Sequence, residues 1–164
     1  MNIQNQINRL KELLNQTYLL LFKKMAEDTK PKKTLSEYAH DLKGFDASPD
    51  NQAPFDLACA ETVSYLARYV VPNFPSFVGT VELNAYLKKH YKQLVGPKKD
   101  AIVVSPSRGN VHGHTGVIDK DWNILSNDSD NGKLGIYWNI NKWARYYANT
   151  LGLEMNYYDL SQPL

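Results

Sequence analysis

The sequence predicts an α+β protein in which helices come first and a mostly antiparallel β-sheet follows. Within residues 2–94, apolar side chains recur every three or four positions, which is the period of an amphipathic helix. From residue 100 onward, short apolar runs alternate with polar turns, which is the pattern of strands joined as hairpins. With 164 residues, of which 43% are hydrophobic, the chain is long enough for one core and an extension.

The first predicted helix covers residues 2–27. Its apolar positions alternate in spacing between four and three, as in the seam of a coiled coil or of a helix that docks on a neighbouring surface. The pattern leaves open both packing on its own domain and self-association or docking on a partner. The seam consists of Ile3, Ile7, Leu10, Leu14, Thr17 and Leu21.

A second, shorter helix is predicted over 35–45, with Gly44 as its C-terminal glycine. The segment DASPDNQAP that follows contains two prolines, two aspartates and no large apolar residue, which is typical of a loop. We therefore expect a helical extension over 1–45 and a separate domain over 46–164.

The domain is predicted to begin with two more helices. The first covers 55–71, with Asp56 as its N-cap and Cys59 in its opening turn, and it stops at Pro72. The second covers 80–94, with Thr80 as its cap.

The remaining chain changes to the period of strands. We expect a hairpin, formed by two strands that the turn DKDWN joins, and a closing helix over 140–152 that ends at Gly152. The predicted strands are 100–105, 115–119, 123–127, 133–138 and 153–160.

Composition excludes several classes of protein. The net charge of +2 is too small for a strongly basic nucleic-acid-binding surface. A single cysteine cannot form an internal disulfide or a thiolate-rich metal site. The N-terminus lacks the pattern of a secretory signal, and the apolar run YLLLF is too short to span a bilayer. We expect no membrane span, no cofactor, and synthesis in the cytoplasm without a signal peptide.

Cys59 is the first residue whose position indicates chemistry. A thiol in the first turn of a helix lies near the positive end of the helix dipole and near unpaired N–H groups, which favour the thiolate. The thiolate is the attacking species in cysteine catalysis. The alternative is that Cys59 is a small buried hydrophobic residue, as most lone cysteines are.

His112 and His114 precede an apolar strand, two positions apart. Mounted at the strand start, His114 could take the proton of a nearby thiol and return it to a leaving amine. Two alternatives remain: both rings lie in water, or the pair binds a metal. The metal would need more ligands from DKDWN, which lacks the glycine of a calcium loop, and we therefore expect no metal.

A histidine base needs a group that orients its ring. If the strands over 115–119 and 123–127 pair, Asn127 falls near His114, and its side-chain oxygen can accept the other ring N–H. Asp128 is the reserve, because neighbouring side chains of a strand point to opposite faces. The run NDSDNGK is also a good turn sequence in its own right.

Together these segments resemble the NlpC and CHAP types of cell-wall cysteine peptidase. The resemblance rests on FDLACAETVSYL, DAIVVSPSRGNVHGHTGVI and ILSNDS, and it covers roughly residues 50–160. It implies a papain-like fold, with Cys59 as nucleophile, His114 as base and Asn127 as the polar orienter. The chain departs from the family pattern in having Ala58 before the cysteine, and in Glu61, whose position suits the start of a helix.

The resemblance also implies a reaction, the hydrolysis of an amide bond in peptidoglycan. The bond would join muramic acid to alanine, as for an amidase, or lie within the peptide, as for an endopeptidase, and a phage-type lysin is one such protein. His112, Trp122 and Trp138 are candidate substrate contacts. Such an enzyme acts on the wall only after release or delivery from the cytoplasm.

Two other functions stay open. The same fold could serve as a non-catalytic structural or binding protein of a virion or cell-wall apparatus, which would assemble through helix 2–27. An acyltransferase, in which an amine replaces water, would use the same residues.

Overall fold

The computed structural model describes Arg9, 11–14, 16–18 and 33–164. Contacts divide the chain into one unit of residues 1–32 and a second of residues 33–164. The described residues of the first unit are helical, and Leu14 and Thr17 of the predicted seam are exposed. The other seam positions, Ile3, Ile7, Leu10 and Leu21, lie outside the described residues.

The second unit is built around a six-stranded sheet in which all neighbouring strands run antiparallel. The strand order across the sheet is β1-β6-β2-β3-β4-β5. The predicted α+β class with a mostly antiparallel sheet is therefore confirmed. The strands are β1 (Tyr91–Leu94), β2 (Ile102–Ser105), β3 (His114–Ile118), β4 (Asn123–Asp128), β5 (Lys133–Asn139) and β6 (Asn156–Pro163).

Helix α2 (Leu35–Asp41) begins with a capping box. The Thr34 side chain accepts the N–H of Glu37, and the Glu37 carboxylate accepts the N–H of Thr34, so two N–H groups that lack helical partners are satisfied. The helix packs on α3 (Cys59–Arg68) and on β3, and it belongs to the same unit as the sheet. The sequence had instead assigned this helix to the N-terminal extension.

The predicted helix 55–71 is divided into a 3₁₀ turn, η1 (Phe55–Leu57), and α3. The Phe55 carbonyl accepts a hydrogen bond from Asn127 Nδ2 instead of closing a helical turn. Asp56 as N-cap was wrong: Ala58 occupies that position and caps without a side-chain hydrogen bond. Cys59 is the first residue of α3, as expected.

Helix α4 (Thr80–His90) is shorter than the predicted helix 80–94, and its N-cap is Gly79 rather than Thr80. The last four predicted residues form β1, an edge strand that pairs with β6. Lysine, glutamine and leucine have good helix propensity, but pairing with a neighbouring strand outweighs this weak preference.

The hairpin and the following strands lie close to where the sequence placed them. In the hairpin, Val117 pairs with Leu125 and Ile118 with Ile124. The predicted helix 140–152 consists of α5 (Ile140–Trp143) and a π-helical segment, η2 (Ala144–Thr150). It ends at Gly152 with a φ of +64°, a conformation that glycine adopts without strain.

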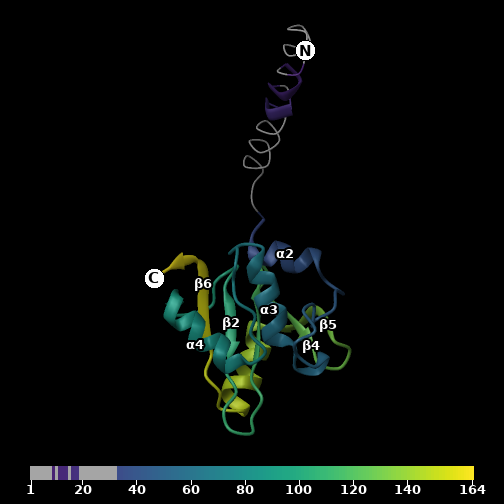
Figure 1. The fold of residues 1–164 in the computed structure, drawn as a ribbon. Coiled ribbons are helices and arrows are strands. Elements are labelled where there is room, and N and C mark those ends of the chain that lie inside the picture. The colour runs from purple at the N-terminus through teal and green to yellow at the C-terminus, as the bar shows by residue number, and fades with distance from the viewer. Residues whose placement is uncertain (1–8, 10, 15, 19–32) are drawn as a thin grey trace. The chain divides into compact units, whose positions relative to one another are not determined.

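Each face of the sheet has its own core. On one face α2, α3 and α4 cover a cluster that includes Val63, Leu66 and Tyr158 (Figure 1). On the other face α5 and η2 cover a smaller cluster around Trp143, whose indole N–H donates to Ser105 Oγ at 2.9 Å. Among the described residues, no helix is long and apolar enough to cross a bilayer.

Candidate active site

Cys59 opens onto a cavity of about 300 Å³ at the N-terminal end of α3. Its side chain is only 7% exposed. His114, from the start of β3, and His112, from the loop before it, line the same cavity, as does Tyr147 of η2. The structure therefore brings the predicted nucleophile, the predicted base and one predicted substrate contact to a single site.

Burial controls the protonation of the sulfur. It raises the pKa of the Cys59 thiol to about 11. The backbone N–H groups of Thr115, Ala60 and Cys59 itself oppose this rise, because they hydrogen-bond to the thiolate. The expectation that the helix start lowers the pKa of Cys59 is therefore wrong for the net effect: the N–H groups act in the expected direction, but desolvation outweighs them. At neutral pH the resting sulfur is a thiol.

Glu61 shapes the loop that leads to Cys59. Although fully buried, its carboxylate accepts four hydrogen bonds from the 48–53 loop. The donors are Ser48 Oγ and the backbone N–H groups of Asp50, Gln52 and Ala53, at 2.7–3.2 Å. Glu61 lies in the first turn of α3, as the sequence indicated, and its carboxylate also anchors the preceding loop against that helix.

His114 packs against a cluster of aromatic rings. It is 6% exposed and stacks on Trp143, with centroids 5.2 Å apart, and on Tyr147, with centroids 5.8 Å apart. Burial lowers the pKa of the imidazole to about 4, and a hydrogen bond to the backbone carbonyl of Asn127 partly opposes this. The resting ring is therefore neutral, which is the form that accepts a proton.

Among the described residues, the His114 ring is not one of the groups that shift the pKa of Cys59. The resting site is thus a neutral thiol and a neutral imidazole facing one cavity, rather than a preformed ion pair.

Gly113 fixes the approach to His114. A Cβ at this position would lie 2.0 Å from the Ser105 carbonyl oxygen and 2.5 Å from the Ser107 nitrogen. The Gly113 N–H donates to Ser107 Oγ at 2.8 Å. Only glycine allows the backbone at 113 to approach the backbone at 105–107 this closely. This contact places His114 at the cavity wall.

Asn127 lies near His114, but it contacts the ring through its backbone carbonyl rather than through its side chain. Its side-chain Nδ2 donates to the Phe55 carbonyl at 2.9 Å. Its Oδ1 is buried without a hydrogen-bond partner in the described structure. The reserve residue, Asp128, accepts the N–H of Asp130 and lies at the end of β4.

The three predicted substrate contacts fall in different places. His112 is exposed and lines the Cys59 cavity. Trp138 lines a second cavity of about 400 Å³, which shares His114, Ser129 and Tyr147 with the first. Trp122 belongs to the turn at the opposite end of β3 and is not among the residues that line either cavity.

Tyr147 is the main residue that sequence reasoning missed. It lines both cavities, and burial together with nearby Cys59 and Tyr146 raises the pKa of its hydroxyl, which keeps it protonated as a donor. Trp143, Tyr146 and Tyr147 are spaced three and four apart, which places them on one helical face. That spacing was the sequence signal from which an aromatic face including Tyr147 could have been predicted.

Asp119 holds the DKDWN turn together and contacts α2. Its buried carboxylate accepts the N–H groups of Asp121 and Asn123 and contacts His40 Nε2 at 3.1 Å. These contacts lower the pKa of Asp119 against an opposing effect of burial. No group of three metal-ligating side chains occurs in the part of the chain that the structure describes.

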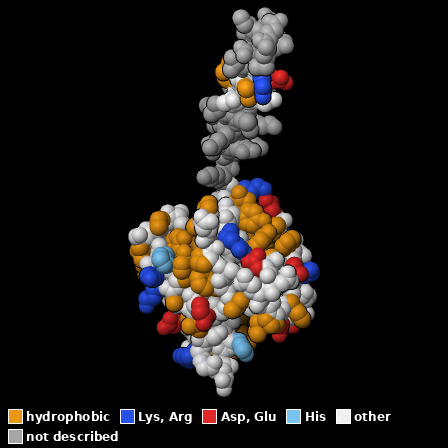
Figure 2. All heavy atoms as spheres, in the orientation of Figure 1, with side chains coloured by type: hydrophobic (Ala, Val, Ile, Leu, Met, Phe, Trp, Pro, Cys, Tyr) orange, Lys and Arg blue, Asp and Glu red, His pale blue; other side chains and the backbone are white. Residues whose placement is uncertain are grey.

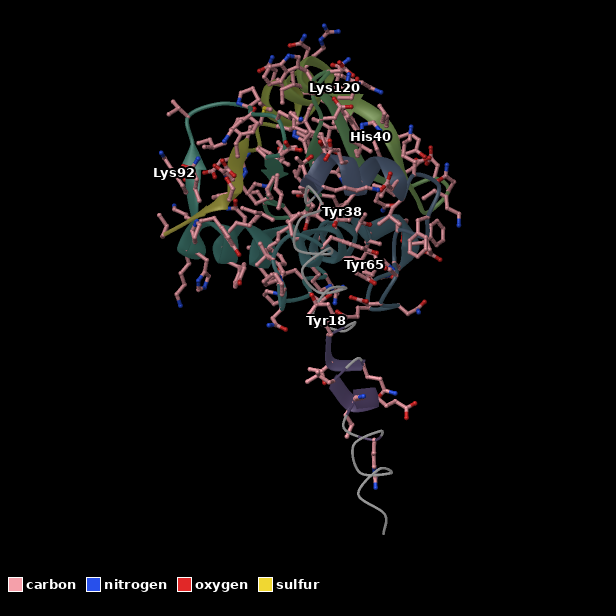
Figure 3. The ribbon with its side chains drawn as sticks, turned by 90° about the horizontal axis from the view of Figure 1, so that it is seen from above. Tyr18, Tyr38, His40, Tyr65, Lys92 and Lys120 are labelled. Atoms are coloured by element: carbon pink, nitrogen blue, oxygen red, sulfur yellow. The ribbon has the colours of Figure 1, made fainter. Side chains whose placement is uncertain are left out.

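A half-buried aromatic cluster lies outside the site, on α2 and at α3 and its C-terminal end. Hydrophobic side chains gather over these helices in Figure 2, and Figure 3 shows Tyr38 and Tyr65 close together. Tyr69 stacks on Tyr38 and meets Tyr65 edge to face. None of these three rings lines the Cys59 cavity.

No protein-family model matches the chain, and no curated protein sequence matches it.

Proposed function

We propose that this protein hydrolyses an amide bond, with Cys59 as nucleophile and His114 as general base. One observation carries the proposal: the only cysteine of the chain and a neutral, oriented histidine line the same cavity, although 55 positions separate them. The stacked rings of Trp143 and Tyr147 orient His114. The loop before Cys59 is fixed by its hydrogen bonds to Glu61.

The reaction starts from the neutral pair. As the sulfur attacks the substrate carbonyl carbon, the thiol proton passes to the imidazole, and the C=O electron pair moves to the oxygen. The N–H groups that face Cys59 are the donors available to that oxyanion. The imidazolium then protonates the leaving amine as the C–N bond breaks, and water hydrolyses the acyl-enzyme.

We propose peptidoglycan as the substrate class. The support is the resemblance of the Cys59, His114 and Asn127 segments to NlpC and CHAP peptidases. Amidase and endopeptidase activity both fit the site, and so does acyl transfer to an amine.

The test is digestion of purified wall sacculi with the wild-type protein, Cys59→Ala and His114→Ala, with the fragments identified by mass spectrometry. His90→Asn is the matched control, because His90 is exposed at the end of α4. We expect new amine termini from the wild type and the control only. Identical fragments from wild type and Cys59→Ala would end the proposal.

One observation favours a second candidate, a non-catalytic structural or binding protein. The Cys59 pKa of about 11 is typical of an inert buried thiol rather than of a preactivated nucleophile. This candidate predicts binding to sacculi without any fragment release, and the same digestion experiment separates the two.

A further inference from the structure

The second cavity, of about 400 Å³, lies next to His114 and is not needed for the attack by sulfur. Its walls include the aromatic rings of Tyr137, Trp138 and Tyr147, and its polar lining includes Asn127, Asp128 and Asp130. A cavity with aromatic walls and a few polar groups is the usual form of a small-molecule subsite.

Asn127 supplies the first sign of a missing ligand. Its side chain is 1% exposed, and its Oδ1 has no hydrogen-bond partner in the described structure. The Phe55 carbonyl accepts from Nδ2 and so fixes which end of the amide is the oxygen. Buried acceptors are nearly always paired, and this one therefore indicates a donor supplied by a bound molecule.

The charges at this cavity supply the second sign. Asp128 and Asp130 are in no ion pair within the described residues. Lys142 also lines the cavity, and its ammonium lies over the Trp138 ring at 4.8 Å and donates to the Tyr137 carbonyl, so two carboxylates stand against one ammonium and the net charge of the lining is negative. The polar part of the cavity thus offers acceptors and negative charge.

We propose that this cavity binds a primary ammonium group carried on a short alkyl chain, such as a lysine-like side chain of the substrate. The ammonium donates to Asn127 Oδ1 and pairs with Asp128 and Asp130, while its methylenes contact the aromatic walls. A phosphate or carboxylate would be repelled by the two aspartates. As a specificity site beside His114, this assignment rests on the proposed function.

The experiment measures binding without turnover. Isotope-labelled Cys59→Ser protein, full length, is titrated with Nα-acetyl-lysine amide and with Nα-acetyl-norleucine amide, which has a methyl group in place of the ammonium. We expect amide shifts at residues 127–130 and 138, and about tenfold weaker binding of the norleucine probe.

Asp128→Asn and Asp130→Asn should each weaken binding of the lysine probe about fivefold and leave the norleucine probe unchanged. Asp121→Asn is the matched control, because Asp121 is an exposed aspartate at the far end of the hairpin. Equal affinity for the two probes, or lysine binding unaffected by both substitutions, overturns the inference.

The two proposals fail separately. If the protein digests sacculi but binds the lysine and norleucine probes equally well, the ammonium site is wrong and the hydrolase proposal stands. If the lysine probe binds as expected but wild type and Cys59→Ala give identical fragments, the ammonium site stands and the hydrolase proposal is wrong.

Discussion

At the residue scale, burial acts on Cys59 and His114 in opposite directions. It raises the pKa of the thiol to about 11 and lowers that of the imidazole to about 4, because in each case the charged form loses its hydration. Each residue thus rests in its neutral form at pH 7.

The first prediction concerns the reactivity of Cys59. Because the thiolate is the reacting species, alkylation by iodoacetamide should be slow at pH 7 and should still be rising above pH 9, the pKa of an ordinary thiol. The rate is measured by mass spectrometry from pH 6 to 10.5, with the urea-unfolded chain as the reference. A plateau below pH 8 would show that the thiol is preactivated.

The second prediction concerns stability against pH. His114 has a lower pKa in the folded protein, about 4, than its ordinary value of 6.5, so between these values the unfolded chain binds more protons. The free energy of unfolding should therefore fall as the pH drops from 6.5 to 4, by up to about 3 kcal/mol. Urea unfolding measures the slope, and His114→Gln should flatten it, whereas His90→Asn should not.

At the element scale, the turn before β3 depends on close approach of two backbones. Gly113→Ala would place a Cβ against the Ser105 carbonyl, and we expect a loss of about 2 kcal/mol or more in the free energy of unfolding. Gly96→Ala is the matched control, because nothing lies within 4 Å of its added Cβ. Urea unfolding measures both, and equal stabilities would contradict the packing argument.

The 48–53 loop depends on one carboxylate. In Glu61→Gln, an NH₂ group would face backbone N–H donors, and we expect a loss of about 2 kcal/mol. Amide hydrogen exchange should accelerate at Asp50, Gln52 and Ala53. Glu82→Gln, at an exposed position in the first turn of α4, serves as the control. Unchanged exchange would show that the loop holds its shape without this anchor.

The elements differ in how far sequence could predict them. The hairpin was predictable because two short apolar runs flank a polar turn, and both signals are local. β1 was not, because its pairing partner, β6, lies more than 60 positions away. The break at η1 depends on a hydrogen bond from Asn127, and local pattern carries no trace of such a contact.

The candidate site follows the same division. Cys59, His112 and His114 could be found from residue type and position, and they share a cavity. The spacing of the aromatic residues marked a helical face that includes Tyr147, but the cavity that Tyr147 lines and the loop that Glu61 binds depend on contacts outside their own helices. The side-chain role predicted for Asn127 differs from the observed backbone contact with His114, and its Nδ2 instead donates to the Phe55 carbonyl, 72 positions away in the sequence.

At the scale of the whole molecule, the described members of both core clusters lie within residues 33–164. A chain that begins at Lys33 should therefore unfold at the same urea concentration as the full chain. A chain that begins at Asp46 loses Leu35 and Ala39 from the core and should be less stable by about 3 kcal/mol or more. Equal midpoints for the two truncated chains would instead support a boundary at residue 45.

Asn127 connects the supports of the two reacting groups. Its Nδ2 donates to the Phe55 carbonyl in the turn just before Cys59, and its backbone carbonyl accepts a hydrogen bond from the His114 ring. Because both contacts come from one residue of β4, a displacement of that strand should act on both supports together. We therefore expect the relative position of Cys59 and His114 to change little when the sheet moves.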